Sequence, residues 1–136
     1  MGLVKDPDLY RCGIAGAAVS DPRFLYDFHW SDQTEGGREY DLPVVLGDKV
    51  KDAAILAAGS AVEQAGRVKA PLLLVHGRRD RRVPIENAER MLDALRKNNK
   101  QVDWVVYPEE GHGFFFPENR YDYYRKVEAF LAKHLK

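Results

Sequence analysis

Residues 71–107 hold two apolar runs that flank one amphipathic segment, and this order constrains the fold more than any other feature of the chain. The run PLLLV, residues 71–75, is uniformly apolar, which is typical of a strand covered on both faces. The run VDWVVY, Val102–Tyr107, is β-branched and aromatic. Between them, apolar residues recur at helical spacing after Pro84, a residue that suits the first turn of a helix. Strand, helix, strand predicts a parallel sheet with a crossover helix.

Weaker patterns predict the rest of an α/β fold. The run CGIAGAAV, residues 12–19, is small and apolar and predicts a third strand, and a shorter helix is expected over about residues 48–58. Residues 21–43 lack clear periodicity, which indicates a long loop with at most one helical turn. A last helix is expected over about residues 118–135. Its predicted apolar stripe consists of Tyr124, Val127, Phe130, Leu131 and Leu135. The expected architecture is a parallel sheet of about three strands with flanking helices.

Composition and charge exclude several classes of function. Lys and Arg number 21 and Asp and Glu also number 21, so no net charge favours nucleic acid or an anionic membrane. No apolar run approaches the roughly 20 residues that span a bilayer, and the first residues do not resemble a signal peptide. The single Cys12 excludes an internal disulfide, and no two histidines have metal-site spacing. We expect a soluble protein, cytoplasmic or exported, without cofactor, metal, nucleic-acid or membrane partner.

An acid and a histidine follow two neighbouring predicted strands. Asp80 comes shortly after PLLLV, in HGRRDRRVP, and His112 comes shortly after VDWVVY, between Gly111 and Gly113. Functional groups gather at the carboxyl ends of the strands in open α/β sheets. Adjacent parallel strands lie about 4.8 Å apart, so the two side chains can meet at one edge of the sheet.

This pair of residue types points to nucleophilic hydrolysis. A carboxylate beside a histidine orients the imidazole and stabilises the imidazolium that forms when the ring accepts a proton. The usual proton donor is a serine hydroxyl, a poor nucleophile until a base assists it. Gly111 and Gly113 let the chain turn tightly around His112 and leave one side of the ring uncrowded. Asp80 and His112 are therefore the candidate acid and base.

Several of these residues also have a structural interpretation. Asp80 alone could be a turn or helix-cap residue, and His112 could be a loop histidine packed on the phenylalanines that follow it. Taken alone, Asp80 is more typical of a turn residue; the position of His112, together with the family resemblance described below, favours the catalytic interpretation. His76 ends a buried strand and is interpreted as a satisfied core histidine, and Cys12 is interpreted as a buried thiol.

Charged and aromatic runs near the two loops are equally ambiguous. The four arginines around Asp80 are interpreted as a solvated turn rather than a nucleic-acid site, with a contact to a substrate carboxylate as the weaker alternative. Glu109 and Glu110 are adjacent, so in an extended segment they point in opposite directions and do not form an acid–base pair. The aromatic run FFFPENRYDYY is interpreted mainly as core packing under the last helix.

The stretches LLLVHGRRDRRVP and YPEEGHGF resemble the C-terminal catalytic domain of the prolyl oligopeptidase family of serine peptidases, in particular its acylaminoacyl-peptidase and dipeptidyl-aminopeptidase-like branch. The opening LVKDPDLYRCGIAGAAVSDP looks like the segment after the nucleophile in that family, so the resemblance covers nearly the whole chain. It implies an α/β-hydrolase fold with a triad in the order Ser, Asp, His. Asp80 would then be the triad acid and His112 the base, acting on a peptide substrate in the complete enzyme.

The nucleophile elbow of that family, Gly-x-Ser-x-Gly-Gly, does not occur in this sequence. The serines are Ser20, Ser31 and Ser60, and none has the flanking glycines. We therefore expect residues 1–136 to be a partial α/β-hydrolase domain, its C-terminal half, with nucleophile and oxyanion-hole donors upstream. The chain alone is then expected to be inactive. Alternatives are an esterase or dienelactone-hydrolase-like enzyme, and a non-catalytic module that self-assembles or binds a partner.

The strand predicted from Cys12 to Val19 has a further consequence. By the family resemblance, it would pair with the strand that carries the nucleophile. Without that neighbour it is an uncovered sheet edge, and it is rich in Ala and Gly. We therefore expect self-association through this edge or through the apolar face beside it.

Overall fold

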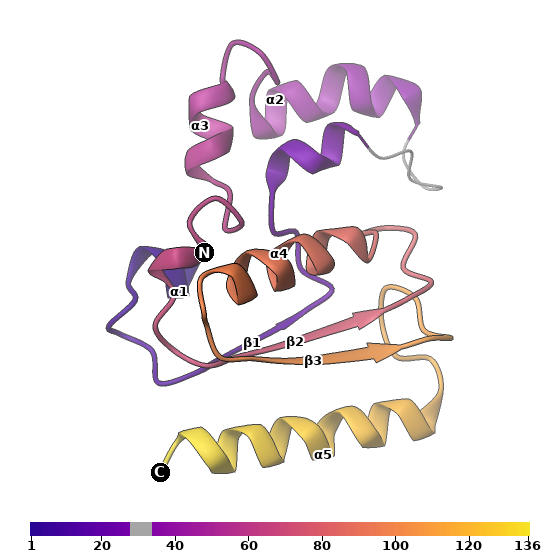
Figure 1. Ribbon diagram of the computed structural model, residues 1–136. Coiled ribbons are helices and arrows are strands. Elements are labelled where there is room, and N and C mark those ends of the chain that lie inside the picture. The colour runs from indigo at the N-terminus through magenta and orange to yellow at the C-terminus, as the bar shows by residue number, and fades with distance from the viewer. Residues whose placement is uncertain (28–33) are drawn as a thin grey trace.

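Parallel strands form the central sheet in the computed structural model, which describes residues 1–27 and 34–136 (Figure 1). They are β1 (Gly13–Gly16), β2 (Leu72–Gly77) and β3 (Val102–Tyr107), in the order β1-β2-β3. β2 lies in the centre, with Leu72 paired to Gly13 on one side and to Val102 on the other. The α/β architecture predicted from the sequence is confirmed.

Helices cover both faces of the sheet. Side chains along β2 alternate between the two faces, so each helix packs on a different set of them. Leu74 belongs to the apolar cluster under α4 (Glu86–Lys97). Leu73 packs on the opposite face with Phe130 of α5 (Pro117–His134). Figure 1 shows α4 and α5 on opposite sides of the strands. A run buried on both sides needs no polar alternation, which is why PLLLV is uniformly apolar.

Two short elements extend the layer that contains α4. They are α1 (Gly2–Lys5) and η3 (Ala65–Arg67). Val4 of α1 and Val68, directly after η3, are buried in the same cluster as Leu95 of α4. The first residues of the chain therefore pack on the core beside the centre of the sheet.

The loop predicted over residues 21–43 contains more helix than expected. Its elements are η1 (Pro22–Tyr26), η2 (Gly37–Asp41) and the start of α2 (Leu42–Leu46). Asp21 begins the first of them, because its carboxylate accepts the Arg23 N–H at 3.0 Å. Elements this short contribute too few apolar residues for a helical period to be visible in the sequence. The predicted helix over residues 48–58 is shorter than expected and is confined to α3 (Ala53–Ala58).

The strand predicted over residues 12–19 is also shorter, because only Gly13–Gly16 joins the ladder. Ala17 still donates its N–H to the Val75 carbonyl at 3.0 Å, but its φ of 46° turns the chain away from the sheet. β1 pairs with β2 alone among the described strands. Self-association through the segment from Cys12 to Val19 stays a prediction.

The last helix lies within one residue of its predicted bounds, but its buried face is rotated. The side chains that pack on the sheet are Tyr123, Val127 and Phe130, while Tyr124 and Leu135 are exposed. The predicted stripe was therefore wrong at both of its ends. An 18-residue helix that crosses a narrow sheet buries only one row of side chains, so aromatic residues beside that row remain in solvent.

Candidate active site

Asp80 and His112 meet at the carboxyl edge of the sheet. Asp80 lies in residues 78–83, the acid loop, which follows β2, and His112 lies in residues 108–116, the histidine loop, which follows β3. The Nδ1 atom of His112 lies 2.9 Å from Oδ2 of Asp80. The Asp80 side chain is fully buried, whereas 36% of the His112 side chain is exposed. The pair therefore presents one side of the imidazole to solvent and the other to a carboxylate.

The two carboxylate oxygens of Asp80 contact different groups. Oδ1 accepts the N–H groups of Arg82 at 2.9 Å and Val83 at 2.8 Å, which closes the turn of the acid loop. Oδ2 is left for His112. The two interpretations that the sequence left open, turn residue and histidine partner, thus describe the same side chain. The turn holds the carboxylate in one orientation, which favours a fixed hydrogen bond to the ring.

The acid loop and the histidine loop are joined through their main chains. Arg79 donates its N–H to the Glu110 carbonyl at 2.8 Å. Gly77 lies so close to the histidine loop that a Cβ atom there would sit 2.3 Å from the carbonyl oxygen of Gly111. Only glycine permits this approach. The separation between Asp80 and His112 is therefore set by backbone contacts.

Aromatic residues support the histidine loop from one side. Phe114 packs edge-on against Tyr107, with ring centroids 5.1 Å apart, and stacks on Tyr123 at 4.7 Å. Phe115, in contrast, is 77% exposed, and Phe116 is also exposed. The interpretation of the aromatic run as core packing is therefore correct for Phe114 and Tyr123 and wrong for the two phenylalanines that follow Phe114.

Glu110 is a buried group that the sequence reasoning missed. Glu109 is exposed and pairs with an arginine, whereas the Glu110 carboxylate accepts N–H groups from Phe115, Phe116 and the Asn119 side chain. Burial raises the pKa of Glu110, but these three hydrogen bonds outweigh burial and hold its pKa below the ordinary value. The signal in the sequence was an acid just before a glycine-flanked histidine and a few residues before a helix start.

His76 is buried as predicted, but only one of its ring nitrogens is satisfied. Its Nε2 donates to the Val83 carbonyl at 2.8 Å and lies 3.5 Å from Oδ2 of Asp80. Its Nδ1 has no hydrogen-bond partner among the described residues. Because a carbonyl can only accept, Nε2 carries a proton, and the His76 ring packs behind the acid loop.

A recess of about 250 Å³ opens beside the His112 ring. Its lining includes His76 and Gly77 from β2, and Gly16 and Ala17 from the end of β1. Ala17 has the left-handed φ of 46°, which is strained for a residue with a side chain. A group that occupies this recess would lie beside His112, which is one of its lining residues.

The serines of the described residues are engaged away from His112. Ser20 is buried and donates to the Asn87 carbonyl at 2.5 Å. Ser60 is also buried, and its Oγ accepts the Glu63 N–H at 3.3 Å. Ser31 lies outside the described residues. Neither described serine hydrogen-bonds to the imidazole, in agreement with their lack of the elbow sequence.

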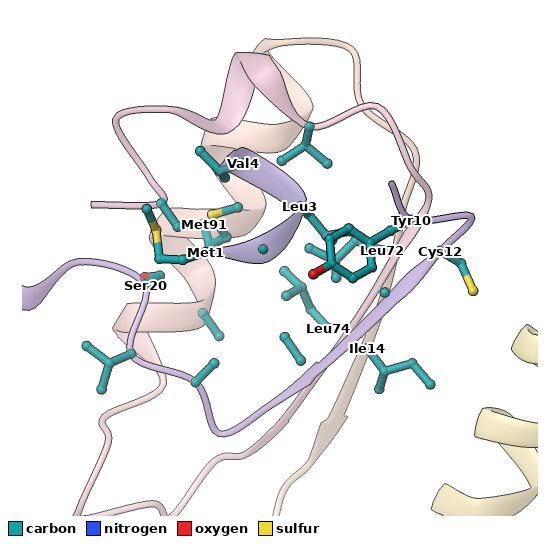
Figure 2. A pocket seen from close by; sticks show the side chains of 18 of the residues that line it. Met1, Leu3, Val4, Tyr10, Cys12, Ile14, Ser20, Leu72, Leu74 and Met91 are labelled. Atoms are coloured by element: carbon teal, nitrogen blue, oxygen red, sulfur yellow. The ribbon is translucent and has the colours of Figure 1, made fainter. Parts of the chain in front are cut away.

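Figure 2 shows a second cavity, of about 300 Å³, on the side of the sheet that faces α4. Residues of α1, β1, β2 and α4 line it, among them Leu3, Ala15, Leu74 and Met91. Cys12 also borders it, but its side chain is half-buried and packs with the cluster on the opposite face. The lining is mostly apolar, and its polar side chains besides Cys12 are Tyr10, Ser20 and His76.

Two further findings apply to residues 1–27 and 34–136. No group of three His, Cys, Asp or Glu side chains gathers there in a way that could hold a metal ion. No helix in the same residues is long and apolar enough to cross a membrane. His29 lies outside these ranges.

Comparison with known proteins agrees with the geometry of the two loops. The sequence profile of the prolyl oligopeptidase family matches residues 1–136. The chain belongs to this family. The resemblance noted in the sequence is thereby confirmed over the whole length, and the chain is part of a family of serine peptidases with the α/β-hydrolase fold.

Curated relatives of this chain are considerably longer than the chain itself. Dipeptidyl aminopeptidase BIII of Pseudoxanthomonas mexicana is 32% identical over 137 residues, which cover 97% of this chain and 19% of that protein. A putative carboxymethylenebutenolidase of Methylorubrum extorquens is 40% identical over 68 residues, which cover 50% of this chain and 23% of that protein. The chain therefore spans about a fifth of the length of these relatives.

Solved structures of the family contain the same arrangement of strands and helices. The uncomplexed acylaminoacyl peptidase of Pyrococcus horikoshii superimposes with a TM-score of 0.84 at 26% identity, over 98% of this chain and 22% of that one. The order of strands and the flanking helices of this chain are therefore those of the family's α/β-hydrolase domain.

Proposed function

We propose that this chain supplies the acid and the base of a serine-peptidase triad that acts on peptide or acyl-aminoacyl bonds. In this proposal His112 is the general base and Asp80 is the acid that orients it. The observation that carries the proposal is the 2.9 Å contact between His112 Nδ1 and the buried Oδ2 of Asp80, with His112 also lining a recess.

The chemistry follows from the two ring nitrogens of His112. A carboxylate at Nδ1 favours the tautomer in which Nδ1 carries the proton and Nε2 has a free lone pair. Nε2 then accepts the proton of a serine hydroxyl as the oxygen attacks the scissile carbonyl. The same nitrogen returns the proton to the leaving amine, and it later activates the water that hydrolyses the acyl-enzyme. Asp80 stabilises the imidazolium in each half-reaction.

The serine is the part of the triad for which this chain offers no candidate. Ser20 and Ser60 are buried and engaged elsewhere, and none of the three serines lies in an elbow sequence. We therefore propose that catalysis requires a serine presented at the recess beside His112, and that the chain by itself has negligible peptidase activity.

The substrate class in this proposal rests on the names of the relatives, a dipeptidyl aminopeptidase and an acylaminoacyl peptidase. An esterase or dienelactone-hydrolase-like activity is less well supported. The match to the putative carboxymethylenebutenolidase covers half of the chain, whereas the family profile covers all of it.

A graft tests the assigned roles. This chain replaces the aligned segment of the Pseudoxanthomonas mexicana dipeptidyl aminopeptidase, and hydrolysis of a dipeptidyl chromogenic substrate is measured. We expect activity in the graft and a fall in kcat of about 10⁴-fold for Asp80→Asn and at least as much for His112→Ala. Asp93→Asn, at an exposed acid of α4, is the matched control and leaves the rate unchanged.

Two results would contradict the proposal. A graft that hydrolyses the substrate equally well with His112→Ala shows that the chain acts as a non-catalytic module. Hydrolysis by the ungrafted chain above a buffer blank, lost in His112→Ala, shows instead that the chain has a nucleophile of its own.

A further inference from the structure

Glu110 is a buried carboxylate that the proposed proton transfers do not use. It lies two residues before His112, and its side chain is removed from solvent. A charged group in the interior is stable only where hydrogen bonds replace its hydration. Here these hydrogen bonds come from Phe115 and Phe116 at the end of the histidine loop and from Asn119 in the first turn of α5.

The carboxylate ties the two ends of the histidine loop together. Its Oε2 accepts the Phe115 N–H at 2.8 Å, and its Oε1 accepts the Phe116 N–H and an Asn119 amide hydrogen, both at 3.0 Å. Phe116 is the N-cap residue of α5, and its own side chain makes no capping hydrogen bond. Glu110 therefore provides the capping acceptor at the start of α5, where a negative charge is favourable.

The main chain of Glu110 is attached to the acid loop. Its carbonyl accepts the Arg79 N–H, and a Cβ atom on Gly77 would lie 2.5 Å from the same oxygen. This one residue thus connects the acid loop, the histidine loop and the start of α5. His112 lies between the two points at which Glu110 holds its loop.

We propose that Glu110 is a positioning residue for His112, and that its carboxylate keeps the imidazole on Asp80. The inference deepens the proposed function and rests on it for the catalytic meaning of this geometry. Both carboxylate oxygens accept from N–H donors, so a glutamine cannot replace Glu110, because its NH₂ group would face one of those donors. Without the carboxylate, the chain between Gly111 and Phe115 is released and the ring leaves Oδ2 of Asp80.

The test reads the His112 ring directly and needs no substrate. Ring ¹⁵N chemical shifts of the whole chain are recorded at a pH of about 8, above the ordinary histidine pKa of about 6.5, and the His112 signals are assigned with His112→Gln. In the wild type we expect the proton on Nδ1. In Glu110→Gln we expect the shifts of mixed neutral tautomers and loss of the low-field Nδ1–H proton signal. Glu109→Gln, at the neighbouring exposed acid, is the matched control and leaves the ring unchanged.

The outcomes separate positioning from a purely structural role. A folded Glu110→Gln chain in which His112 keeps its Nδ1–H tautomer overturns the inference, even if the variant is less stable. If Glu110→Gln does not fold, Asn119→Ala decides, because it removes one donor and leaves the carboxylate. A partial change of tautomer then supports the inference, and an unchanged ring overturns it.

The tautomer measurement can fail or succeed independently of the graft that tests the proposed function. A tautomer change in Glu110→Gln together with a folded graft that hydrolyses no peptide would remove the peptidase role and leave the positioning role intact. An active graft, together with an unchanged His112 tautomer in Glu110→Gln, would support the peptidase role and remove the positioning role.

Discussion

The later region of the chain, residues 70–136, and the described part of the earlier region, residues 1–27 and 34–59, are packed in different ways. β2 and β3 pair over six residues, whereas β1 pairs with β2 over four. The later region covers β2 with a helix on each face. The earlier region consists largely of short helical elements that leave apolar side chains in solvent, Val44 for example at 85% exposure. Both the acid loop and the histidine loop belong to the better-packed region.

This difference indicates which side chains must be positioned accurately. The contact between Asp80 and His112 depends on two loops that leave neighbouring, fully paired strands. Of the described residues in the earlier region, only Gly16 and Ala17 line the recess. A hydrogen bond between an acid and a base requires rigid elements that hold both side chains in place. Residues that only line a recess need less precise positions.

The largest effect in this comparison is expected from Gly77→Ala. The new Cβ would meet the Gly111 carbonyl, so we expect a loss of about 3 kcal/mol or more in the free energy of unfolding, measured by urea denaturation. Gly36→Ala is the control in the earlier region, because Gly36 has a helical φ of −60° and open space around it. It should change stability by less than about 1 kcal/mol. Equal effects at the two glycines would contradict the assigned close approach.

The next effect compares a buried apolar side chain of the later region with an exposed one of the earlier region. Leu95→Ala removes a fully buried side chain beneath α4, and we expect a loss of about 3 kcal/mol in the free energy of unfolding. Val44→Ala should change it by less than about 0.5 kcal/mol, because Val44 is already in solvent. Thermal and urea denaturation of both variants check this. A costly Val44→Ala would show that α2 is covered in solution.

A smaller effect on the free energy of unfolding is expected when the pH is lowered. Burial raises the pKa of both Glu110 and Asp21, but hydrogen bonds, from the histidine loop and from Arg23 respectively, lower each pKa below its ordinary value. A lowered folded-state pKa gives stability that is present above the unfolded value and is lost as pH falls through the folded value. The Glu110 contribution to stability should therefore fade as the pH falls below 4.5, and that of Asp21 as it falls below 3.8.

Urea denaturation between pH 6 and pH 3 separates these two contributions. Glu110→Gln should flatten the fall that begins near 4.5, and Asp21→Asn should flatten only the fall that begins near 3.8. If Glu110→Gln leaves the pH dependence unchanged, its hydrogen bonds do not stabilise the ionised form.

The weakest effect concerns the free edge of β1. The edge is four residues long, so any association through it should be visible only in concentrated solution. Light scattering at high protein concentration should then give a mass above the 15.5 kDa of one chain. A mass of one chain at every concentration would count against self-association through the segment from Cys12 to Val19.

The sequence predicted the frame of the site well because its signals are local. A uniformly apolar run indicated β2, and β-branched and aromatic residues gave the bounds of β3 without error. The meeting of Asp80 and His112 followed from geometry, since both come shortly after adjacent parallel strands. The family resemblance added the roles of these residues, which stay proposals.

What the sequence did not reveal depends on contacts between distant residues. Glu110 resembles its exposed neighbour Glu109 until the chain folds and brings Phe115 and Asn119 to it. The face of α5 was displaced by about one residue because Tyr123 and Tyr124 are equivalent in composition, and only packing against Phe114 selects the first. The turn at Ala17 has no sequence signal, since alanine rarely adopts a left-handed φ.

The acid loop also has a consequence for proteolysis. It contains four arginines within five residues, which makes it a dense target for trypsin in an unfolded chain. The side chains of Arg78 and Arg79 are exposed, yet their N–H groups donate to the Tyr107 and Glu110 carbonyls. A protease must draw a segment out of the structure before it can cut, and here that step breaks hydrogen bonds that continue the central ladder. The richest tryptic sequence of the chain should therefore be among the last to be cleaved while the sheet remains folded.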